Sequence, residues 1–332
     1  MGTEDSDAPA RIVGLSKDEA TEELVAEDET RDPQYVRAVL DHVTDGDGVI
    51  TRDAVDDAVT DTSMILSTAE TRVELATIAL SEATEAARDV ADVDAVRTRL
   101  DTFEQQVSAA EERVSELGSE MQSLSHWHSD SRPVYDLVTD LRGVASDAQT
   151  VQRVADDVQF ELEEFEHWLS DDDLRRCDLG SDVDALERSL DDVARTREDL
   201  DTDTDAVEAS GVDAEVAADA AETWYGAMLR CRVVPLLLAD LRAELADLRE
   251  LAARDDIDDT SGLDDIETRL DDIDAQADQH ATELDALASQ AWTDRYGELL
   301  ADFRSALDEF EPPVSWGAVQ KELDRFRDGP TN

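Results

Sequence analysis

Lysine is nearly absent from this chain of 332 residues: Lys17 and Lys321 are its two lysines, and arginine supplies the rest of the fixed positive charge. Acidic residues are abundant, with 86 Asp and Glu against 29 Lys and Arg, so the formal net charge is -57. Such self-repulsion opposes folding in dilute buffer, whereas at about 1 M salt the Debye length falls to ~3 Å and most of it is screened. The carboxylates are interleaved with apolar residues throughout and are not gathered in an acidic tail. This acid-rich, lysine-poor composition is typical of proteins from a cytoplasm that contains multi-molar KCl. We expect a cytoplasmic protein of a halophile.

The chain also lacks a basic patch and a long apolar run. Its arginines occur singly or in brief clusters such as Arg175-Arg176, which aspartates flank. Binding to nucleic-acid phosphates requires a basic patch or stripe, so nucleic acid is excluded as a direct partner, and an anionic membrane surface is unfavourable for the same reason. The longest apolar run, residues 233–239, is far shorter than the roughly 20 residues of a membrane span. The acidic start lacks the pattern of a signal peptide, and we predict no membrane span.

Catalytic and metal-binding motifs are missing as well. Cys177 and Cys231 are isolated, so they form neither a disulfide framework nor a metal-ligand pair at motif spacing. The sequence contains no GxSxG, glycine-rich phosphate loop or HExxH pattern. We predict a non-enzymatic protein with no catalytic residues, no cofactor and no metal site.

Glycine and proline are scarce, at 13 and 7 residues, and alternating strand patterns are absent, which favours an all-α fold. Apolar residues recur at spacings of three and four over 93–124 and again over 134–169, with a turn-like segment at 125–133 between them. This sustained alternation is typical of a coiled-coil seam. Two helices of matching length joined by a short loop form an antiparallel hairpin most simply.

A third helix is expected to pack against this hairpin. Four apolar residues flank the heptad seam and would widen it: Val138, Val154, Phe160 and Trp168. Before the hairpin, Ser67 and Glu70 have the form of a capping box at a helix start. A helix over 68–90 would follow, either separate from the hairpin or continuous with it, with Asp92 or Asp94 as the cap of a restart.

We predict elongated antiparallel helical hairpins forming a coiled-coil bundle. Its expected segments are an acidic flexible start with a small helical part at 1–66, a first hairpin at 67–176, a connecting helix and linker at 177–213, a second hairpin at 214–311, and a short final helix and tail at 312–332. Within these segments, the acidic stretch 201–205 should interrupt a helix, and Pro235 should kink or break one. Residues 255–262 are expected to form a loop.

Several polar residues stand out against this pattern. His126, Trp127 and His128 occupy the tip of the first hairpin, and because zinc requires three or four ligands while no neighbouring Cys or His joins them, we interpret them as a solvent-facing interaction tip with an exposed Trp127. Arg197 and His280 lie at seam positions where an apolar residue is expected. A polar residue there fixes register or helix pairing, and we predict that role for both.

The segment 45–53, DGDGVITRD, is similar to the middle of a calcium-binding helix-loop-helix. When it is aligned with such sites, the first ligand position falls on Val43 and the bidentate twelfth on Ala54, and neither offers a ligand oxygen from its side chain. We therefore interpret the segment as a tight turn before a helix capped by Thr51 or Asp53.

Three stretches resemble a haloarchaeal protein family labelled halo transducer protein: 67–76 (STAETRVELA), 151–157 (VQRVADD) and 162–169 (LEEFEHWL). The resemblance covers most of residues 10–200 and implies kinship with chemotaxis transducers, whose cytoplasmic part is a long antiparallel helical hairpin. The chain departs from those receptors because it lacks transmembrane segments and a HAMP-like linker. The tip at 125–133 also lacks the Gln-, Asn- and Ala-rich stretch that contacts the signalling kinase.

The leading functional hypothesis is a non-enzymatic structural or interaction protein that binds partner helices through its seams or hairpin tips. One alternative is the soluble signal-transduction adaptor that the resemblance implies, and another is a weak calcium-responsive module at 45–53. The expected partners are proteins. Self-association stays open, because heptad seams can close within one chain or between two.

Overall fold

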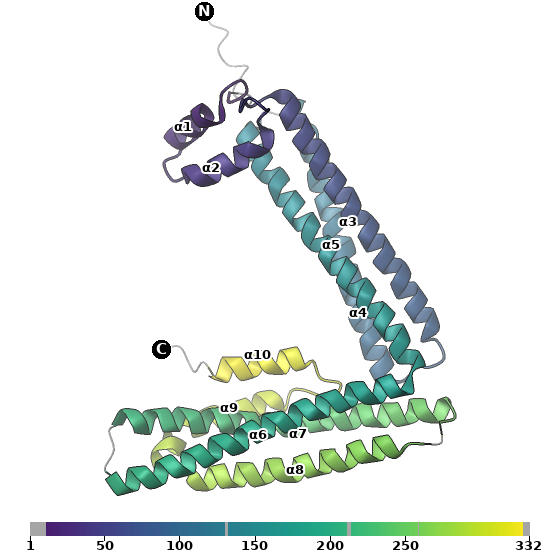
Figure 1. Ribbon diagram of the computed structural model, residues 1–332, viewed down its shortest axis with the longest axis vertical. Helices are drawn as coiled ribbons and strands as arrows, with labels where there is room; N and C mark the ends of the chain where they lie inside the picture. Colours follow the sequence, from purple (N-terminus) through teal and green to yellow (C-terminus); the bar gives the residue numbers. More distant parts are fainter. Residues whose placement is uncertain (1–10, 130–131, 211–213, 258, 328–332) are drawn as a thin grey trace, which may run out of the picture. The chain divides into compact units, whose positions relative to one another are not determined.

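A computed structural model of the protein describes four ranges of the chain: 11–129, 132–210, 214–257 and 259–327. The fold is all-α, as the sequence predicts, and its helices pack as hairpins (Figure 1). In the described ranges, β-type pairing is limited to two isolated bridges, Ser16 with Val49 and Thr44 with Ile50. The chain divides into two compact units. Unit 1 contains the described residues up to Ala86 together with Leu100–Glu166, and unit 2 contains Ala87–Arg99 and the described residues from His167 onward.

Unit 1 is built from α1 (Lys17–Glu27), α2 (Pro33–Leu40), the short 3-10 helices η2 (Asp41–Val43) and η3 (Trp127–Ser129), α3 (Arg52–Ala86), and most of α4 (Asp94–Leu124) and α5 (Val134–Ser170). The first residues of α4, up to Arg99, and the last residues of α5, from His167, belong to unit 2. The three long helices α3, α4 and α5 lie side by side (Figure 1). Between α3 and α4, Thr77 Oγ1 donates to Glu111 Oε1 at 2.8 Å. Between α5 and α3, Gln152 Nε2 donates to the Ile65 carbonyl at 2.8 Å. The expectation that more than two helices pack here is confirmed.

The heptad seam of α4 and α5 is buried, as the spacing predicts. Of the apolar residues in the two series, Val114 and Leu169 are half-buried and the others are buried. The rings of Phe103 and Phe165 meet across the seam, with centroids 5.7 Å apart. The segment that reverses the chain between the helices spans 125–133, of which residues 130–131 lie outside the described ranges.

Two of the four expected seam flankers are placed differently. Val138 and Trp168 are buried, as expected, but Val154 is 41% and Phe160 60% exposed. On a helix of 3.6 residues per turn, Phe160 falls on the side of α5 opposite the buried series that runs through Val158 and Leu162. The prediction that Val154 and Phe160 widen the seam is therefore wrong.

The start of α3 also differs from the sequence-based expectation. α3 runs unbroken from Arg52, so Ser67 is an exposed residue in its interior and the predicted capping box there is wrong. The helix begins instead at Arg52 and is capped by Thr51, whose Oγ1 accepts a hydrogen bond from the Ala54 amide at 3.1 Å. This confirms the alternative cap proposed for that segment. α3 and α4 are separate helices.

The first described residues fold into a small helical part of unit 1. Ser16 forms a capping box with Glu19 at the start of α1, within the region expected to be flexible. Asp32 caps α2, where its side chain accepts from the Gln34 amide at 2.9 Å. Residues 1–10 of the expected flexible start lie outside the described ranges.

Unit 2 is built from α6 (Asp172–Ser210), α7 (Ala214–Arg254), α8 (Ser261–Leu287), α9 (Gln290–Leu307) and α10 (Trp316–Arg327). Helices α6, α7 and α8 pack pairwise on one another. α6 continues through 201–205, so the interruption predicted there is wrong. α7 continues through Pro235, so this proline does not break the helix, and a kink stays a prediction. The loop expected at 255–262 separates α7 from α8 but ends at residue 260, because α8 begins at Ser261; residue 258 lies outside the described ranges. Residues 211–213 of the expected linker also lie outside them.

Polar contacts attach the start of α4 to α7. Arg254 Nη1 and Nη2 donate to the two carboxylate oxygens of Asp92 at 2.7 and 2.8 Å. The amide of Ala95, in the first turn of α4, donates to Asp247 Oδ2 of α7 at 2.8 Å. The first turn of α4 thus receives its carboxylate partner from a distant helix, where the sequence suggested Asp92 or Asp94.

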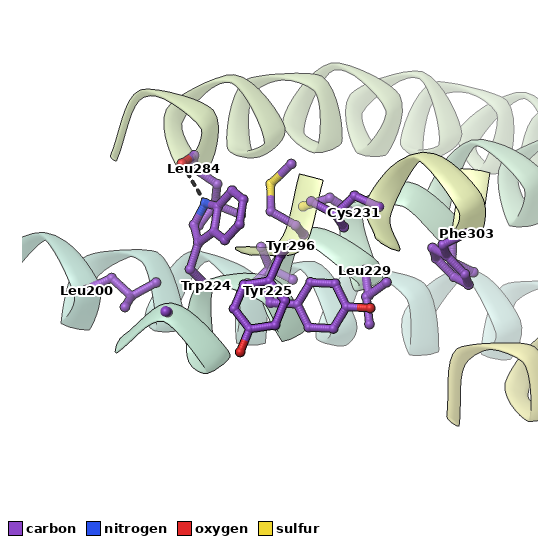
Figure 2. Packing of buried hydrophobic residues seen from close by; sticks show 14 of the residues in the cluster. Leu200, Trp224, Tyr225, Leu229, Cys231, Leu284, Tyr296 and Phe303 are labelled. Carbon is purple, nitrogen blue, oxygen red and sulfur yellow. Dashed lines mark hydrogen bonds between the residues drawn. The ribbon is translucent and has the colours of Figure 1, made fainter. Parts of the chain in front are cut away.

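Aromatic residues fill the other end of unit 2 (Figure 2). Trp224 Nε1 donates to the Leu284 carbonyl at 2.8 Å, and the rings of Tyr225 and Tyr296 stack with centroids 4.5 Å apart. Tyr225 Oη also donates to the carbonyl of Phe326 in α10 at 3.0 Å. These contacts join α7, α8, α9 and α10 into one buried cluster.

Candidate functional site

The solvent-facing side of α3 carries a second apolar series, distinct from the side packed on α4 and α5. Met64, Leu75 and Ile78 lie on it and are 57%, 40% and 48% exposed. With the exposed Thr68 and Thr71 they follow spacings of four, three, four and three, the alternation of a coiled-coil seam. At 1.5 Å per residue this series spans about 21 Å, or two heptads. These five residues are named the outer seam of α3.

Both threonines of the outer seam direct their hydroxyl protons into their own helix. Thr68 Oγ1 donates to the Met64 carbonyl at 2.9 Å, and Thr71 Oγ1 donates to the Ser67 carbonyl at 3.0 Å. Because the helix takes up the hydroxyl proton in this geometry, each threonine offers its methyl group for contact. The outer seam is therefore more apolar than its composition indicates.

Carboxylates bound the outer seam at both ends. Continuing the same spacing toward the start of α3 leads to Asp61 and Asp57, and continuing it toward the end leads to Glu82; all three are exposed. Along the sides of the seam, Arg72 is held by Asp156 of α5 at 3.4 Å. The surface thus consists of an apolar strip about two heptads long with negative charge at each end.

The opposite side of α3 is the one that unit 1 uses. Leu66, Ala69, Val73 and Ala76 follow their own alternation of three and four and are buried against the bundle. A helix with apolar residues on two opposite sides requires a neighbour on each side to bury both. The described residues of unit 1 bury one of them.

Sequence reasoning missed the outer seam for two reasons. The threonines at positions 68 and 71 count as polar in a hydrophobic pattern, and a helix started at Ser67 leaves out Met64. A search that scored threonine as a β-branched apolar residue and began the helix at Thr51 would have found two interleaved heptads in α3.

The predicted interaction tip has a different environment from the one expected. Trp127 is buried, with 8% of its surface exposed, so the expectation of an exposed Trp127 is wrong. Its Nε1 donates to Asp56 Oδ1 of α3 at 3.0 Å, and its ring stacks on His128, whose Nε2 lies 2.9 Å from the same oxygen. His126 and His128 are exposed. The contact to α3 fixes the tip, because a buried indole N–H requires an acceptor.

The loop similar to a calcium site forms a tight turn. Asp45 Oδ1 accepts hydrogen bonds from the amides of Asp47 and Val49, both at 3.0 Å, and Gly48 adopts a positive φ of 77°. The carboxylate is thus engaged by its own loop, and glycine supplies the left-handed conformation at no steric cost. This geometry agrees with the interpretation as a turn before α3.

Arg197 and His280, the two polar seam residues, meet at one carboxylate. Arg197 Nη1 of α6 pairs with Glu283 of α8, and His280 Nδ1 lies 3.8 Å from Glu283 Oε2. Both are largely buried, with 24% and 14% of their side chains exposed. A polar pair across a helix interface favours one register because other registers leave it unpaired, so their predicted role remains consistent with this placement.

Arg99 lines a cleft in unit 2 with a volume of about 260 Å³. Its Nη2 lies 3.1 Å from Asp178 Oδ2 of α6 and 3.1 Å from Glu244 Oε1 of α7, and its guanidinium stacks on Trp168 with 3.8 Å from Cζ to the ring centroid. Burial raises the pKa of Glu244 to about 7, against the opposing effect of Arg99, and the nearby carboxylate of Asp182 adds to the rise. Glu244 thus holds its proton up to near-neutral pH.

The remaining carboxylates of this cleft hold neighbouring segments together. Asp240 accepts from the Val314 amide and from Trp316 Nε1, each at 2.7 Å, while Asp247 accepts from the first turn of α4. The cleft is therefore a junction between helices, and its carboxylates have partners within the protein.

In the described ranges, no group of three or more His, Cys, Asp or Glu side chains is placed to hold a metal ion. No helix in that part of the chain has the length and apolar character that crossing a bilayer requires. Cys177 is exposed and Cys231 is buried, and both are free thiols.

Comparison with known proteins leaves the geometry as the evidence for function. No protein-family model matches the chain, and no curated protein or solved structure matches it.

Proposed function

We propose that the protein is a non-enzymatic helix-binding protein and that the outer seam of α3 is its contact surface. The carrying observation is the run of Met64, Thr68, Thr71, Leu75 and Ile78 at coiled-coil spacing on the exposed side of a helix whose other side is already packed. Apolar side chains at this spacing accept the knobs of a second helix. The heptads of α4 and α5 are occupied within unit 1, so the outer seam takes the role that the sequence assigned to the seams.

The partner inferred from this surface is an amphipathic helix of another protein. It would carry an apolar stripe about two heptads long, with Lys or Arg toward both ends to meet Asp57, Asp61 and Glu82. A second copy of the chain fits less well, because it would bring its own net charge of -57 and the same carboxylates to the contact. Electrostatic complementarity acts mainly on specificity and association rate, so the apolar stripe supplies most of the affinity.

The test uses two synthetic helical peptides with the same apolar stripe. One has lysines at both ends and the other has glutamates. Titration of each into the full chain, followed by fluorescence anisotropy, should show saturable binding of the lysine peptide and at least tenfold weaker binding of the glutamate peptide. Equal binding of both, or of neither, would remove the proposal.

Matched variants locate the contact. Leu75→Gln with Ile78→Gln should abolish binding of the lysine peptide, while Phe160→Gln, which removes a comparably exposed apolar side chain from α5, should leave it unchanged. Analytical ultracentrifugation of the chain alone tests the competing occupant. A dimer that the Leu75→Gln, Ile78→Gln variant converts to a monomer would assign the outer seam to self-association instead.

A further inference from the structure

A cavity of about 570 Å³ lies between α7, α8 and α9 of unit 2, away from the surfaces described above. Its apolar lining comes from Met228, Cys231 and Leu236 of α7, Leu307 of α9 and Phe310. This volume falls within the range of small-molecule sites, which combine an apolar interior with a few polar groups. The cavity therefore has the size and the lining for a small ligand with an apolar body.

Five charged residues also line this cavity: Arg232, Asp278, Asp285, Arg304 and Asp308. Within the described part of the chain, none of these five side chains makes a hydrogen bond or an ion pair with another residue. Arg242, on the same helix as Arg232, binds both Asp271 and Asp274, whereas the exposed Arg188 and Arg230 of unit 2 also make no such contact. Charges of both signs thus line one cavity without pairing with each other.

Pro235 adds a backbone acceptor to the same wall. Proline has no N–H, so within α7 it cannot donate to the carbonyl four residues earlier, which belongs to Cys231. Both residues line the cavity. The wall formed by α7 therefore includes a carbonyl that lacks its usual helical donor, beside apolar side chains.

Two of these charged residues, Asp285 and Arg232, influence the pKa of the Cys231 thiol in the same wall. Burial, together with the carboxylate of Asp285, raises the pKa of the Cys231 thiol to about 11, and Arg232 acts in the opposite direction. Asp285 and Arg232 are therefore both close enough to influence the same buried sulfur. With its pKa so high, the thiol stays protonated and serves as apolar wall.

We propose that this cavity binds a small zwitterion with an apolar body, of the class of free amino acids with apolar side chains. The arginines come from α7 and α9 and would receive the ligand's carboxylate, whereas Asp278 and Asp285 of α8 would receive its ammonium group. The carbonyl of Cys231 is a further acceptor for the ammonium. Met228, Leu307 and Phe310 would enclose the apolar side chain.

Isothermal titration calorimetry with the full chain in concentrated KCl tests the ligand class. Leucine and phenylalanine should bind saturably. Glycine lacks the apolar body, leucinamide lacks the carboxylate and N-acetylleucine lacks the ammonium group, so each should bind at least about tenfold more weakly, as expected for the loss of a charged hydrogen bond or of apolar burial. No saturable binding of leucine or phenylalanine, or equal binding of the singly charged analogues, would overturn the proposal.

Variants place the binding in the cavity. Ala281→Phe fills it, and Arg304→Gln removes an exposed arginine without breaking a contact, so both should weaken leucine binding tenfold or more. Arg188→Gln, an exposed arginine of α6 outside the cavity, should bind leucine like the unaltered chain. If Ala281→Phe does not fold, Arg304→Gln and Asp278→Asn decide the result. Unchanged binding in those two would overturn the assignment. The outer seam variant should bind leucine normally, which separates this test from the helix-binding test.

Discussion

The two units of the protein differ in how many large hydrophobic side chains they leave exposed. Among the described residues, six large hydrophobic side chains stand exposed in unit 1, namely Tyr35, Met64, Leu75, Ile78, Val154 and Phe160, whereas unit 2 exposes Leu174. Each unit has three long helices, so the number of long helices does not explain the contrast. The shorter helices differ in their placement: in unit 2, α9 and α10 pack along the long helices and cover apolar side chains, whereas in unit 1 the small helical part lies at one end of the bundle.

The contrast is clearest between two helices of similar length. α7 packs against α6, α8, α9 and α10, so its apolar residues find cover on several sides. α3 packs on α4 and α5 through one side and leaves the outer seam exposed. Exposed apolar series of this kind mark contact surfaces when they are contiguous. Among the described residues, unit 1 therefore leaves one apolar series without cover, while unit 2 covers most of its own apolar surface.

The largest expected effect is that of salt on the whole fold. Diluting KCl removes the screening of a net charge of -57 and should unfold the chain, with α3, α4 and α5 opening before α6, α7 and α8 because unit 1 covers less of its apolar surface. Hydrogen–deuterium exchange across a KCl series measures both units in one sample. A fold that keeps its protection in dilute buffer would refute the halophilic expectation, and simultaneous opening of both units would erase the contrast.

Truncating a leucine should lower the free energy of unfolding much more on the inner side of α3 than on the outer seam. Leu66→Ala removes a buried side chain from the inner side and should lower the free energy of unfolding by about 3 kcal/mol. Leu75→Ala, on the outer seam of the same helix, should change it by less than about 0.5 kcal/mol. Urea denaturation in concentrated KCl measures both variants. A large loss for Leu75→Ala would show that the outer seam is already covered within the chain.

The comparison also shows which features a sequence can predict. The seams of α4 and α5 followed from their spacing, because burial on one side of a helix depends on local periodicity. The start of α3 did not, since Ser67 and Glu70 match a capping box that the longer helix overrides. Trp127 was misjudged because its acceptor, Asp56, lies 71 residues away in the sequence. Contacts at such a separation have no local signal.

The candidate sites also differ in whether a local sequence pattern indicates them. The outer seam is a local pattern that threonine obscures, and it was within reach of sequence analysis. The meeting of Arg197 with Glu283, 86 residues apart, depends on how α6 packs on α8, although the polar positions themselves were visible in the heptads. The cavity lined by Arg232 and Arg304 is formed by three helices, and no spacing in the sequence indicates it.

Glu244 should give unit 2 a pH dependence that unit 1 lacks. Its folded pKa of about 7 lies above its ordinary value of 4.5, so the folded chain binds this proton more tightly than the unfolded chain does. The cost of ionising the buried carboxyl is absent below about pH 4.5 and complete above about pH 7, so stability falls as pH rises through this window. Glu244→Gln cannot ionise. Its free energy of unfolding should therefore rise relative to the unaltered chain by up to about 3 kcal/mol across the window.

The measurement for Glu244→Gln is urea denaturation at several pH values, taken as a difference from the unaltered chain. Glu298→Gln, at an exposed position of α9, is the control and should show a difference that does not vary with pH. A flat difference for Glu244→Gln as well would mean that water or Arg99 compensates the burial of Glu244.

The smallest expected effect concerns the tip of unit 1. Asp56→Ala leaves the buried Nε1 of Trp127 without its acceptor and frees the ring of His128, so it should cost about 1 kcal/mol of stability. Asp57→Ala, one residue along α3 and exposed, should cost less than about 0.5 kcal/mol. Tryptophan fluorescence adds a structural readout, since a released Trp127 would shift its emission to longer wavelength. If Asp56→Ala leaves both stability and emission unchanged, the tip is not fixed to α3. Trp127 would then again be a candidate for contact with a partner, in addition to the outer seam that we propose.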